Sequence, residues 1–254
     1  MSTRRHITAL MFFCLMPLSA MAQEITVAAA ANLQFTLEEI KTTFEKETGV
    51  KVKTILGSSG KLTAQIENGA PFDVFMSADM DYPERLYSDG VTFGEPKIYA
   101  YGHLVLWTLK GVDLSKGVAG LSDASIKKIA IAASKVAPYG HQAVNTMKYN
   151  HLYPGISSKL VYGESISQVN QFITTEAADV GFTAKSVVLA PNMKDKGKWI
   201  EVDPQSYESI AQGAVILKYA QKQHAKSAQK FYDFLFSSPA REIFKKYGYT
   251  PGNE

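Results

Sequence analysis

The fold is decided by residues 24–76, which have the sequence EITVAAAANLQFTLEEIKTTFEKETGVKVKTILGSSGKLTAQIENGAPFDVFM. The apolar run at 24–30 predicts a short buried strand. Apolar side chains then recur at helical spacing as far as Phe44, and Gly49 stands where a C-terminal cap belongs. The pattern continues as strand, helix and strand at 51–56, 61–68 and 72–76. Such alternation predicts an α/β protein with parallel strands covered by helices.

The same alternation extends along the rest of the chain. Further strands are predicted at 103–108, 128–133, 159–162, 180–183 and 214–218, with helices at 141–151 and 166–177 and two more in the last 30 residues. A stretch at 110–127, rich in Gly, Ser and Asp, predicts a surface connection. The spacing alone does not choose between one sheet and two lobes.

The N-terminus has the pattern of an export signal. Basic residues at 4–6 precede an apolar stretch at 7–18, which ends in Ala20-Met21-Ala22. A charged region, a short apolar region and a small-x-small cleavage site predict a signal peptide at 1–22, with a buried N-terminal helix as the alternative. Cleavage leaves 232 of the 254 residues, and loss of two arginines lowers the formal net charge from +3 to +1. The sequence therefore predicts an exported protein, and the paired arginines leave the twin-arginine and Sec routes open.

Composition and motifs exclude several classes of function. Cys14 is the single cysteine and lies inside the predicted signal peptide, so a disulfide framework and a cysteine zinc site are excluded. The small net charge does not indicate a nucleic-acid binder. Gly60-Lys61 is followed by leucine and does not make a P-loop, and the run 57–60 is one residue short of a nucleophile elbow. No dinucleotide-binding or zinc-protease motif occurs, and the four histidines after residue 22 lack metal-ligand spacing. We therefore expect neither an enzyme nor a bound cofactor.

Four junctions between a strand and a helix share one chemistry. They are Ala31-Asn32, the run Gly57-Ser58-Ser59-Gly60, the run Ala137-Pro138-Tyr139-Gly140, and Ser165-Ile166-Ser167-Gln168, which has the pattern of a capping box. Each predicted helix start offers N–H groups without an intrahelical partner, and the positive end of a helix dipole favours an anion. In a parallel α/β sheet these turns meet at the carboxyl edge, where ligands bind. The sequence therefore predicts an anion site.

Each of these residues also has a purely structural interpretation. Asn, Ser and Pro are ordinary residues at a helix start, where they act as caps. Tyr139 is equally consistent with a packed aromatic ring and with a hydroxyl over a ligand, while the Ile166 side chain is expected to pack and to offer only its backbone. Asp73 and Asp79 flank a predicted buried strand and are expected to be turn or capping acids.

Several stretches resemble the periplasmic molybdate-binding proteins of ABC importers. The resemblance rests on AAAANL at 28–33, GSSGKLTAQI at 57–66 and GAPFDVFMSAD at 69–79, and on FYDFL at 231–235 followed by AREIFKKYGY at 240–249. It covers essentially the whole chain after residue 22. The resemblance implies a type II periplasmic binding protein fold in the periplasm, with two lobes and the ligand clamped between them. It also implies a monomer that delivers molybdate or tungstate to a membrane permease.

The resemblance implies particular residues and boundaries. Asn32 and Ser59 would bind the oxyanion from the first lobe, and Tyr139 and Ile166 from the second, with molybdenum held as its oxyanion and not ligated directly by protein atoms. The lobes would be residues 23–104 plus 213–254 and residues 105–212, with hinge crossings near 103–105 and 212–214. Some relatives have Ser at the position of Asn32, and some have a ligating Tyr at the position of Ala184, where this chain has no hydroxyl.

Neutral donors in a dry cleft would favour a fully deprotonated dianion, because a protonated oxyanion brings a donor with no acceptor. Sulfate satisfies the same donor pattern and stays as the nearest alternative ligand. Two other classes are left open: a secreted hydrolase that uses Ser58 or Ser59 with His141, and a ferric-ion protein that uses some of the thirteen tyrosines. The tyrosines are scattered along the sequence without a His–Glu–Tyr grouping, which disfavours the ferric site.

Overall fold

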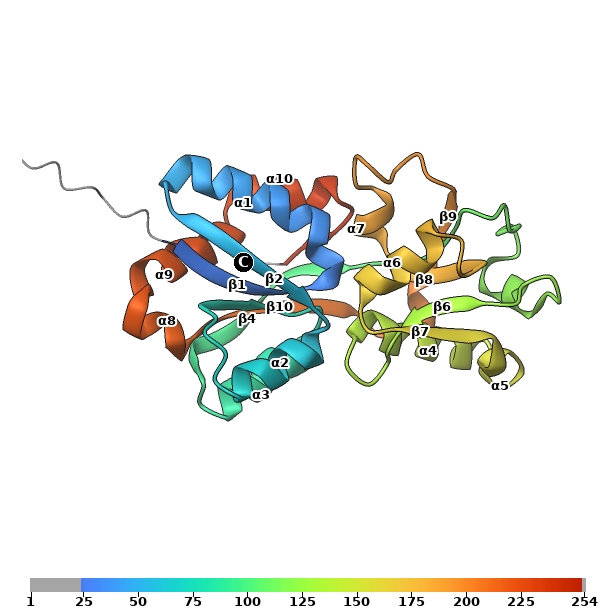
Figure 1. Ribbon diagram of the computed structural model, residues 1–254, viewed down its shortest axis with the longest axis horizontal. Helices are drawn as coiled ribbons and strands as arrows, with labels where there is room; N and C mark the ends of the chain where they lie inside the picture. The colour runs from blue at the N-terminus through green and yellow to red at the C-terminus, as the bar shows by residue number, and fades with distance from the viewer. Residues whose placement is uncertain (1–23, 253–254) are drawn as a thin grey trace, which may run out of the picture.

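The computed structural model describes residues 24–252, so the predicted signal peptide at 1–22 lies outside the described residues. The chain forms two lobes side by side, each built on its own β-sheet with helices on both faces (Figure 1). Both described ends of the chain belong to the first lobe (Figure 1). Within residues 24–252, none of the helices has the length and apolar character needed to span a membrane.

The first lobe contains a six-stranded sheet in the order β11-β4-β10-β3-β1-β2. Its strands are β1 (Glu24–Ala30), β2 (Lys51–Gly57), β3 (Val74–Met76), β4 (Thr92–Gly102), β10 (Ile210–Leu217) and β11 (Thr250–Pro251). Its helices are η1 (Ala31–Leu33), α1 (Gln34–Thr48), α2 (Ser59–Glu67), α3 (Asp81–Ser88), α8 (Lys218–Gln223), α9 (Ala225–Leu235) and α10 (Ser238–Lys246). β1 pairs in parallel with β2 and β3, and β10 and β11 pair antiparallel with their neighbours.

The second lobe contains a five-stranded sheet in the order β7-β6-β8-β5-β9. Its strands are β5 (Leu104–Thr108), β6 (Ile129–Ala132), β7 (Leu160–Gly163), β8 (Val180–Ala184) and β9 (Lys198–Glu201). Its helices are η2 (Gly117–Ser122), α4 (Pro138–Tyr149), α5 (Tyr153–Ile156), η3 (Ser157–Lys159), α6 (Ile166–Thr174), α7 (Lys185–Val188) and η4 (Pro204–Ser206). β6 pairs in parallel with β7 and β8, and β5 pairs antiparallel with β8 and β9.

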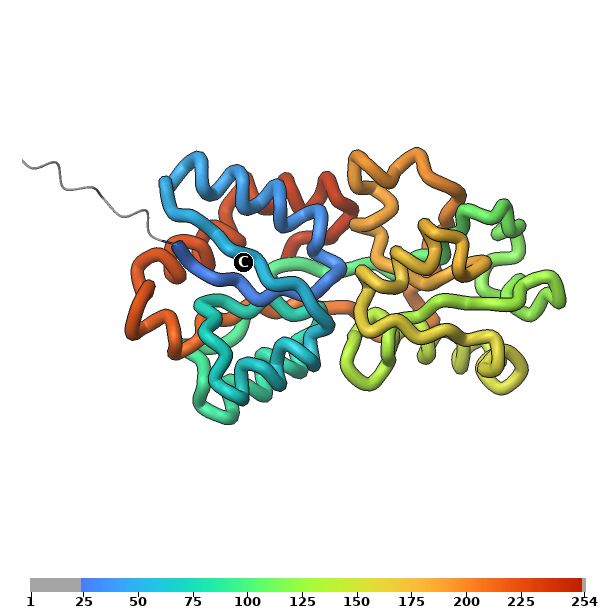
Figure 2. The backbone as a smooth tube through the Cα atoms, in the orientation of Figure 1, coloured from blue at the N-terminus to red at the C-terminus, as the bar shows by residue number. Residues whose placement is uncertain are grey.

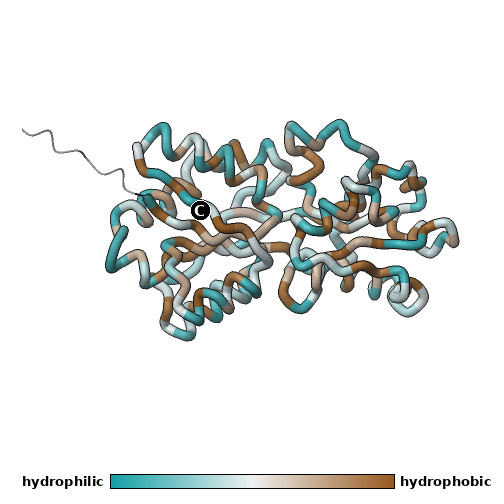
Figure 3. Tube along the Cα trace, viewed as in Figure 1, coloured by the Kyte–Doolittle hydropathy of each residue, from teal (hydrophilic) through white to brown (hydrophobic). Residues whose placement is uncertain are grey.

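The strand β1 is apolar along its length because both of its faces are covered. Ile25, Val27 and Ala29 pack on one face with apolar residues of α1, α9 and α10, whereas Ala28 packs on the other face with α2 and α3. A strand buried on both faces reads as a continuous apolar run. Figure 3 shows hydrophobic colour along the central strands and hydrophilic colour on the outer helices. Burial on both faces holds β1 within the first-lobe core, and the start of η1 follows directly at the carboxyl end of β1.

The chain passes between the two sheets twice. The first passage follows Gly102, the last residue of β4, and leads directly into β5, while the second runs from β9 to β10 (Figure 2). The hydrophobic cluster of the second lobe includes Ala30, Ala31 and Ala78 from the first lobe. The two lobes are therefore packed against each other at the edge where the first-lobe helices begin.

The predicted α/β class and two-lobed fold are confirmed, and the sheets are mixed. The expectation of mostly parallel sheets holds only around β1 and β6, because the strands next to each passage run antiparallel. The predicted 24–30 strand coincides with β1, and Gly49 caps α1 with a left-handed φ of 71°. The sequence patterns gave no expectation of α3, β4 or β9, and they placed the start of α2 two residues too late.

Candidate functional site

A small cavity lies where the four predicted helix starts meet. Its lining residues are Ala30, Ala31, Asn32, Gly57, Ser58, Ser59, Ala78, Ala137, Pro138, Tyr139 and Ile166. The open volume is about 10 Å³, about what one buried water needs. The starts of η1 and α2 in one lobe therefore face those of α4 and α6 in the other, and the predicted meeting of the four junctions is confirmed.

The cavity has a neutral lining. All eleven lining residues are uncharged, and their polar groups are an amide, hydroxyls and backbone groups. The first N–H groups of each helix have no partner inside the helix and carry the positive end of its dipole. The lining can therefore donate several hydrogen bonds to an anion without a lysine or arginine.

Ser59 is the first residue of α2 and is fully buried. Its Oγ accepts a hydrogen bond of 3.0 Å from the backbone N–H of Ala78. A serine hydroxyl has one hydrogen to donate in addition to its acceptor sites. The bond from Ala78 uses Ser59 Oγ as an acceptor and does not use the hydroxyl hydrogen. That hydrogen can therefore be donated to another acceptor, such as an oxygen atom in the cavity.

Asn32 has its side chain turned toward a buried polar network behind the cavity. Its Nδ2 donates to Gln212 Oε1 over 2.7 Å and to Tyr249 Oη over 2.9 Å. The Asn32 carbonyl oxygen accepts from Ser186 Oγ and from Tyr249 Oη. Both amide hydrogens are used inside the protein, so the donor that Asn32 has left for a ligand is its backbone N–H.

Tyr139, the second residue of α4, reaches from the second lobe toward the same network. Its side chain is almost fully buried, and its Oη lies 3.5 Å from Gln212 Nε2, which donates to it. A Cβ on Gly102 would overlap the Tyr139 hydroxyl. The missing side chain at Gly102, where the chain leaves the first lobe, therefore makes room for this hydroxyl.

The start of α6 is only partly as predicted. Ile166 is its first residue, and its side chain packs into the core of the second lobe, as expected. The predicted capping box is wrong in detail: the Ser165 hydroxyl makes no capping bond, and Gln168 Oε1 accepts from the backbone N–H of Glu164 instead. The side chain of Ser165 therefore leaves the first turn of α6 uncapped.

Direct contacts join the two lobes around the cavity. Gly60 N–H donates to the Val136 carbonyl over 2.9 Å, Lys61 pairs with Glu164 over 2.9 Å, and Ser167 Oγ donates to Gln34 Oε1 over 3.0 Å. A Cβ on Gly60 would lie 2.6 Å from Tyr82 Oη and 3.1 Å from the Val136 backbone, so a side chain here would require Tyr82 or the Val136 backbone to shift. The described conformation is accordingly a closed one.

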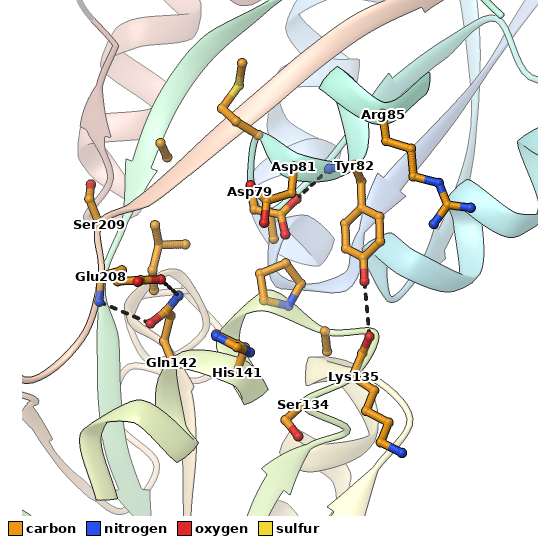
Figure 4. A pocket seen from close by; sticks show the side chains of 16 residues that line it. Asp79, Asp81, Tyr82, Arg85, Ser134, Lys135, His141, Gln142, Glu208 and Ser209 are labelled. Atoms are coloured by element: carbon orange, nitrogen blue, oxygen red, sulfur yellow. Dashed lines mark hydrogen bonds between the residues drawn. The ribbon is translucent and has the colours of Figure 1, made fainter. Parts of the chain in front are cut away.

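A larger groove of about 510 Å³ lies beside the cavity, also between the lobes (Figure 4). Asp79 lies on one side and His141 on the other, and Tyr82 Oη donates to the Lys135 carbonyl across it. Asp79 Oδ1 accepts from Ser77 Oγ and from the backbone N–H of Tyr82, as expected for a turn acid. Burial nonetheless raises the pKa of Asp79 to about 6.

The other predicted acid is structural as well. Asp73 is fully buried, accepts from the backbone N–H of Thr26 and pairs with His224 Nδ1 over 3.0 Å. It does not line the central cavity. Neither aspartate therefore joins the neutral lining.

The hydrolase alternative requires a hydrogen bond between a serine and His141, and the structure does not place these groups together within the described residues. Among the described residues the Ser58 hydroxyl has no hydrogen-bond partner, and the Ser59 hydroxyl accepts from the Ala78 N–H. Within residues 24–252 no hydrogen bond joins either serine to His141, which lines the neighbouring groove. A serine nucleophile needs its base within hydrogen-bond reach, and this arrangement does not provide one.

The ferric-ion alternative is weakened by burial, although the structure does gather three tyrosines. Tyr99 and Tyr139 both bond to Gln212, and Tyr249 bonds to Asn32. Burial raises the pKa of Tyr249 to about 12 and the pKa values of Tyr99 and Tyr139 well above 10. A ferric site needs tyrosinates, which burial disfavours here. Within the described residues, no cluster of three His, Cys, Asp or Glu residues is placed to hold a metal ion.

Gln212, Tyr99 and Tyr249 were not predicted as site residues, and Ser58 was not predicted as a ligand. Gln212 is fully buried on β10 and accepts from Asn32 Nδ2 and from Tyr99 Oη. The predicted strand at 214–218 begins two residues after Gln212, so the sequence pattern gave no signal for its burial on β10. Ala184 is buried at the end of β8 and does not line the cavity.

The chain is similar in sequence and in fold to bacterial solute-binding proteins. Residues 25–250 match the sequence family described as bacterial extracellular solute-binding protein. The chain is 41% identical to the molybdate-binding protein ModA of Azotobacter vinelandii, over 92% of this chain and 93% of that protein, and 38% identical to ModA of Rhodobacter capsulatus, over 97% and 96%. A solved structure of the Azotobacter vinelandii periplasmic molybdate-binding protein superposes with a TM-score of 0.85 at 33% identity, covering 90% of this chain and 100% of that one.

Proposed function

The chain belongs to the bacterial extracellular solute-binding proteins, and on this premise we propose that it captures molybdate, and also tungstate, in the periplasm and delivers it to the permease of an ABC importer. The observation that carries the proposal is the small cavity in which four helix starts meet and whose lining, within residues 24–252, has no charged side chain. The names of the relatives at 41% and 38% identity support molybdate as the ligand. We also propose export by cleavage after Ala22 and action as a monomer.

In this proposal the oxyanion is held by neutral donors from both lobes. The first lobe supplies the backbone N–H of Asn32 and the hydroxyl of Ser59, and the second supplies the hydroxyl of Tyr139 and the backbone N–H of Ile166. Hydrogen bonds to a charged acceptor are about twice as strong as neutral ones. Donors held rigidly by buried helix starts are already oriented before the ligand arrives, so little is lost on ordering them. Molybdenum enters as cargo, inside its oxyanion.

Ligand entry requires the lobes to separate. A tetrahedral oxyanion is larger than one water molecule, whereas the described cavity has room for about one. We propose a hinge motion between a lobe of residues 23–104 plus 213–254 and a lobe of residues 105–212, with the crossings near 103–105 and 212–214. These boundaries differ by one to three residues from the sheets, because Leu104 begins β5 of the second lobe and 210–212 begin β10 of the first. The contact between Gly60 and Val136 and the ion pair between Lys61 and Glu164 would break on opening.

A thermal-shift panel tests the function. Molybdate, tungstate, sulfate and phosphate are added separately to the 232-residue chain, because a ligand that binds only the folded state raises the Tm. We expect molybdate and tungstate to raise the Tm, by an amount that grows with ligand concentration, and phosphate at pH 7 to leave it unchanged. A shift with sulfate and none with molybdate would replace the proposed ligand by sulfate.

A further inference from the structure

Ser58 lines the cavity, and in the described part of the chain its hydroxyl makes no hydrogen bond that would explain the residue structurally. It is the N-cap residue of α2, is 4% exposed and lines the cavity next to Ser59. A serine at this position usually accepts a hydrogen bond from the second or third N–H of its helix. Here the side chain makes no capping bond, although the backbone carbonyl of Ser58 accepts from Leu62 N–H as usual. The residue type therefore is not explained by capping.

The Ser58 hydroxyl is also left without any other partner. Its Oγ is buried and makes no hydrogen bond within the described residues. Of the residues in 24–252 with such an atom, Ser58 is the one that lines the central cavity. A buried polar group without a partner is costly, and native structures keep few of them. The cost is offset when a ligand supplies the partner.

We propose that the Ser58 hydroxyl donates a further hydrogen bond to the bound oxyanion, beside the one from Ser59. This inference rests on the proposed function, since it needs an anion in the cavity. A dianion is the chemistry that fits, because a lone hydroxyl hydrogen is bonded most strongly by a charged oxygen. Two consecutive hydroxyls from the start of α2 then contact the ligand from the first lobe, one held by Ala78 and one free until the ligand binds.

The test compares Ser58→Ala with Ser237→Ala, and both variants are measured for molybdate affinity by calorimetric titration and for Tm without ligand. Ser237 is the matched control, because it is also an N-cap serine but its Oγ does accept from Ala240 N–H. We expect Ser58→Ala to weaken molybdate binding by about 10- to 100-fold and to leave the ligand-free Tm unchanged or slightly raised. Ser237→Ala should lower the Tm and leave the affinity unchanged.

Two results would overturn the inference. One is a Ser58→Ala variant that binds molybdate as tightly as the unmodified protein does. The other is weaker binding together with a loss of Tm as large as that of Ser237→Ala, which would mark the hydroxyl as structural. Failure of the unmodified protein to bind molybdate is a different outcome, because it rejects the proposed function and not the role of Ser58 alone.

Discussion

Replacing Ser59 with Ala is expected to weaken molybdate binding by about 10- to 100-fold and to lower the free energy of unfolding by about 1–3 kcal/mol. The loss of affinity follows because the hydroxyl hydrogen no longer reaches the oxyanion. The loss of stability has a separate cause: the Ala78 N–H, which now donates to Ser59 Oγ over 3.0 Å, would be buried without an acceptor. Calorimetric titration and urea denaturation measure the two effects.

The loss of both affinity and stability distinguishes Ser59 from its neighbour Ser58, for which only the affinity should fall. A control is Ser125→Ala, which removes an exposed hydroxyl bonded to Asp123 in a turn of the second lobe and should leave the affinity unchanged. Unchanged molybdate affinity in Ser59→Ala would remove this residue from the ligand set. Its hydroxyl would then serve only as the acceptor for the backbone N–H of Ala78.

Replacing Gln212 with Leu is expected to lower the free energy of unfolding by about 3 kcal/mol or more. The side chain is fully buried, and its Oε1 accepts from Asn32 Nδ2 over 2.7 Å and from Tyr99 Oη over 3.0 Å. Leucine of similar size fills the space but leaves these donors without Gln212 as acceptor. Tyr139 also loses the hydrogen bond from Nε2, so molybdate affinity should fall as well.

Urea denaturation measures the stability of this variant, and titration measures its affinity. Gln171→Leu serves as the control, because Gln171 is exposed on α6 and a surface substitution of this kind usually changes stability by less than about 0.5 kcal/mol. If Gln212→Leu were as stable as the unmodified protein, the hydrogen bonds of Gln212 on β10 to Asn32 and Tyr99 would not contribute to stability.

The first lobe was predictable where burial alone sets the pattern. β1 is covered on both faces, so its apolar run identified all of its residues. β4 was not predicted, because Gly94, Pro96 and Lys97 interrupt it and many of its side chains are exposed. Its pairing with β10 and β11, which lie more than one hundred residues away in the sequence, holds it in the sheet. Local pattern carries no information about such pairing.

The candidate site was predictable to the extent that helix starts define it. The four junctions were found because Asn, Ser and Pro mark helix starts, and the carboxyl edge of the strands brings them together. The orientation of individual side chains was not predictable. Asn32 bonds to Gln212 and Tyr249, which are 180 and 217 residues away, and the unpartnered state of Ser58 is visible only once its surroundings are known.

The most direct test of the account is the position of a heavy oxyanion in a crystal. Crystals of the 232-residue chain grown with tungstate give an anomalous signal that locates tungsten without reference to the protein atoms. One strong peak is expected between the lobes, placed so that the oxygen atoms bonded to tungsten lie within hydrogen-bonding range of Ser59 and of the first residues of α4 and α6. A single strong peak elsewhere, for instance beside Lys61 and Lys135 at the surface, would contradict it.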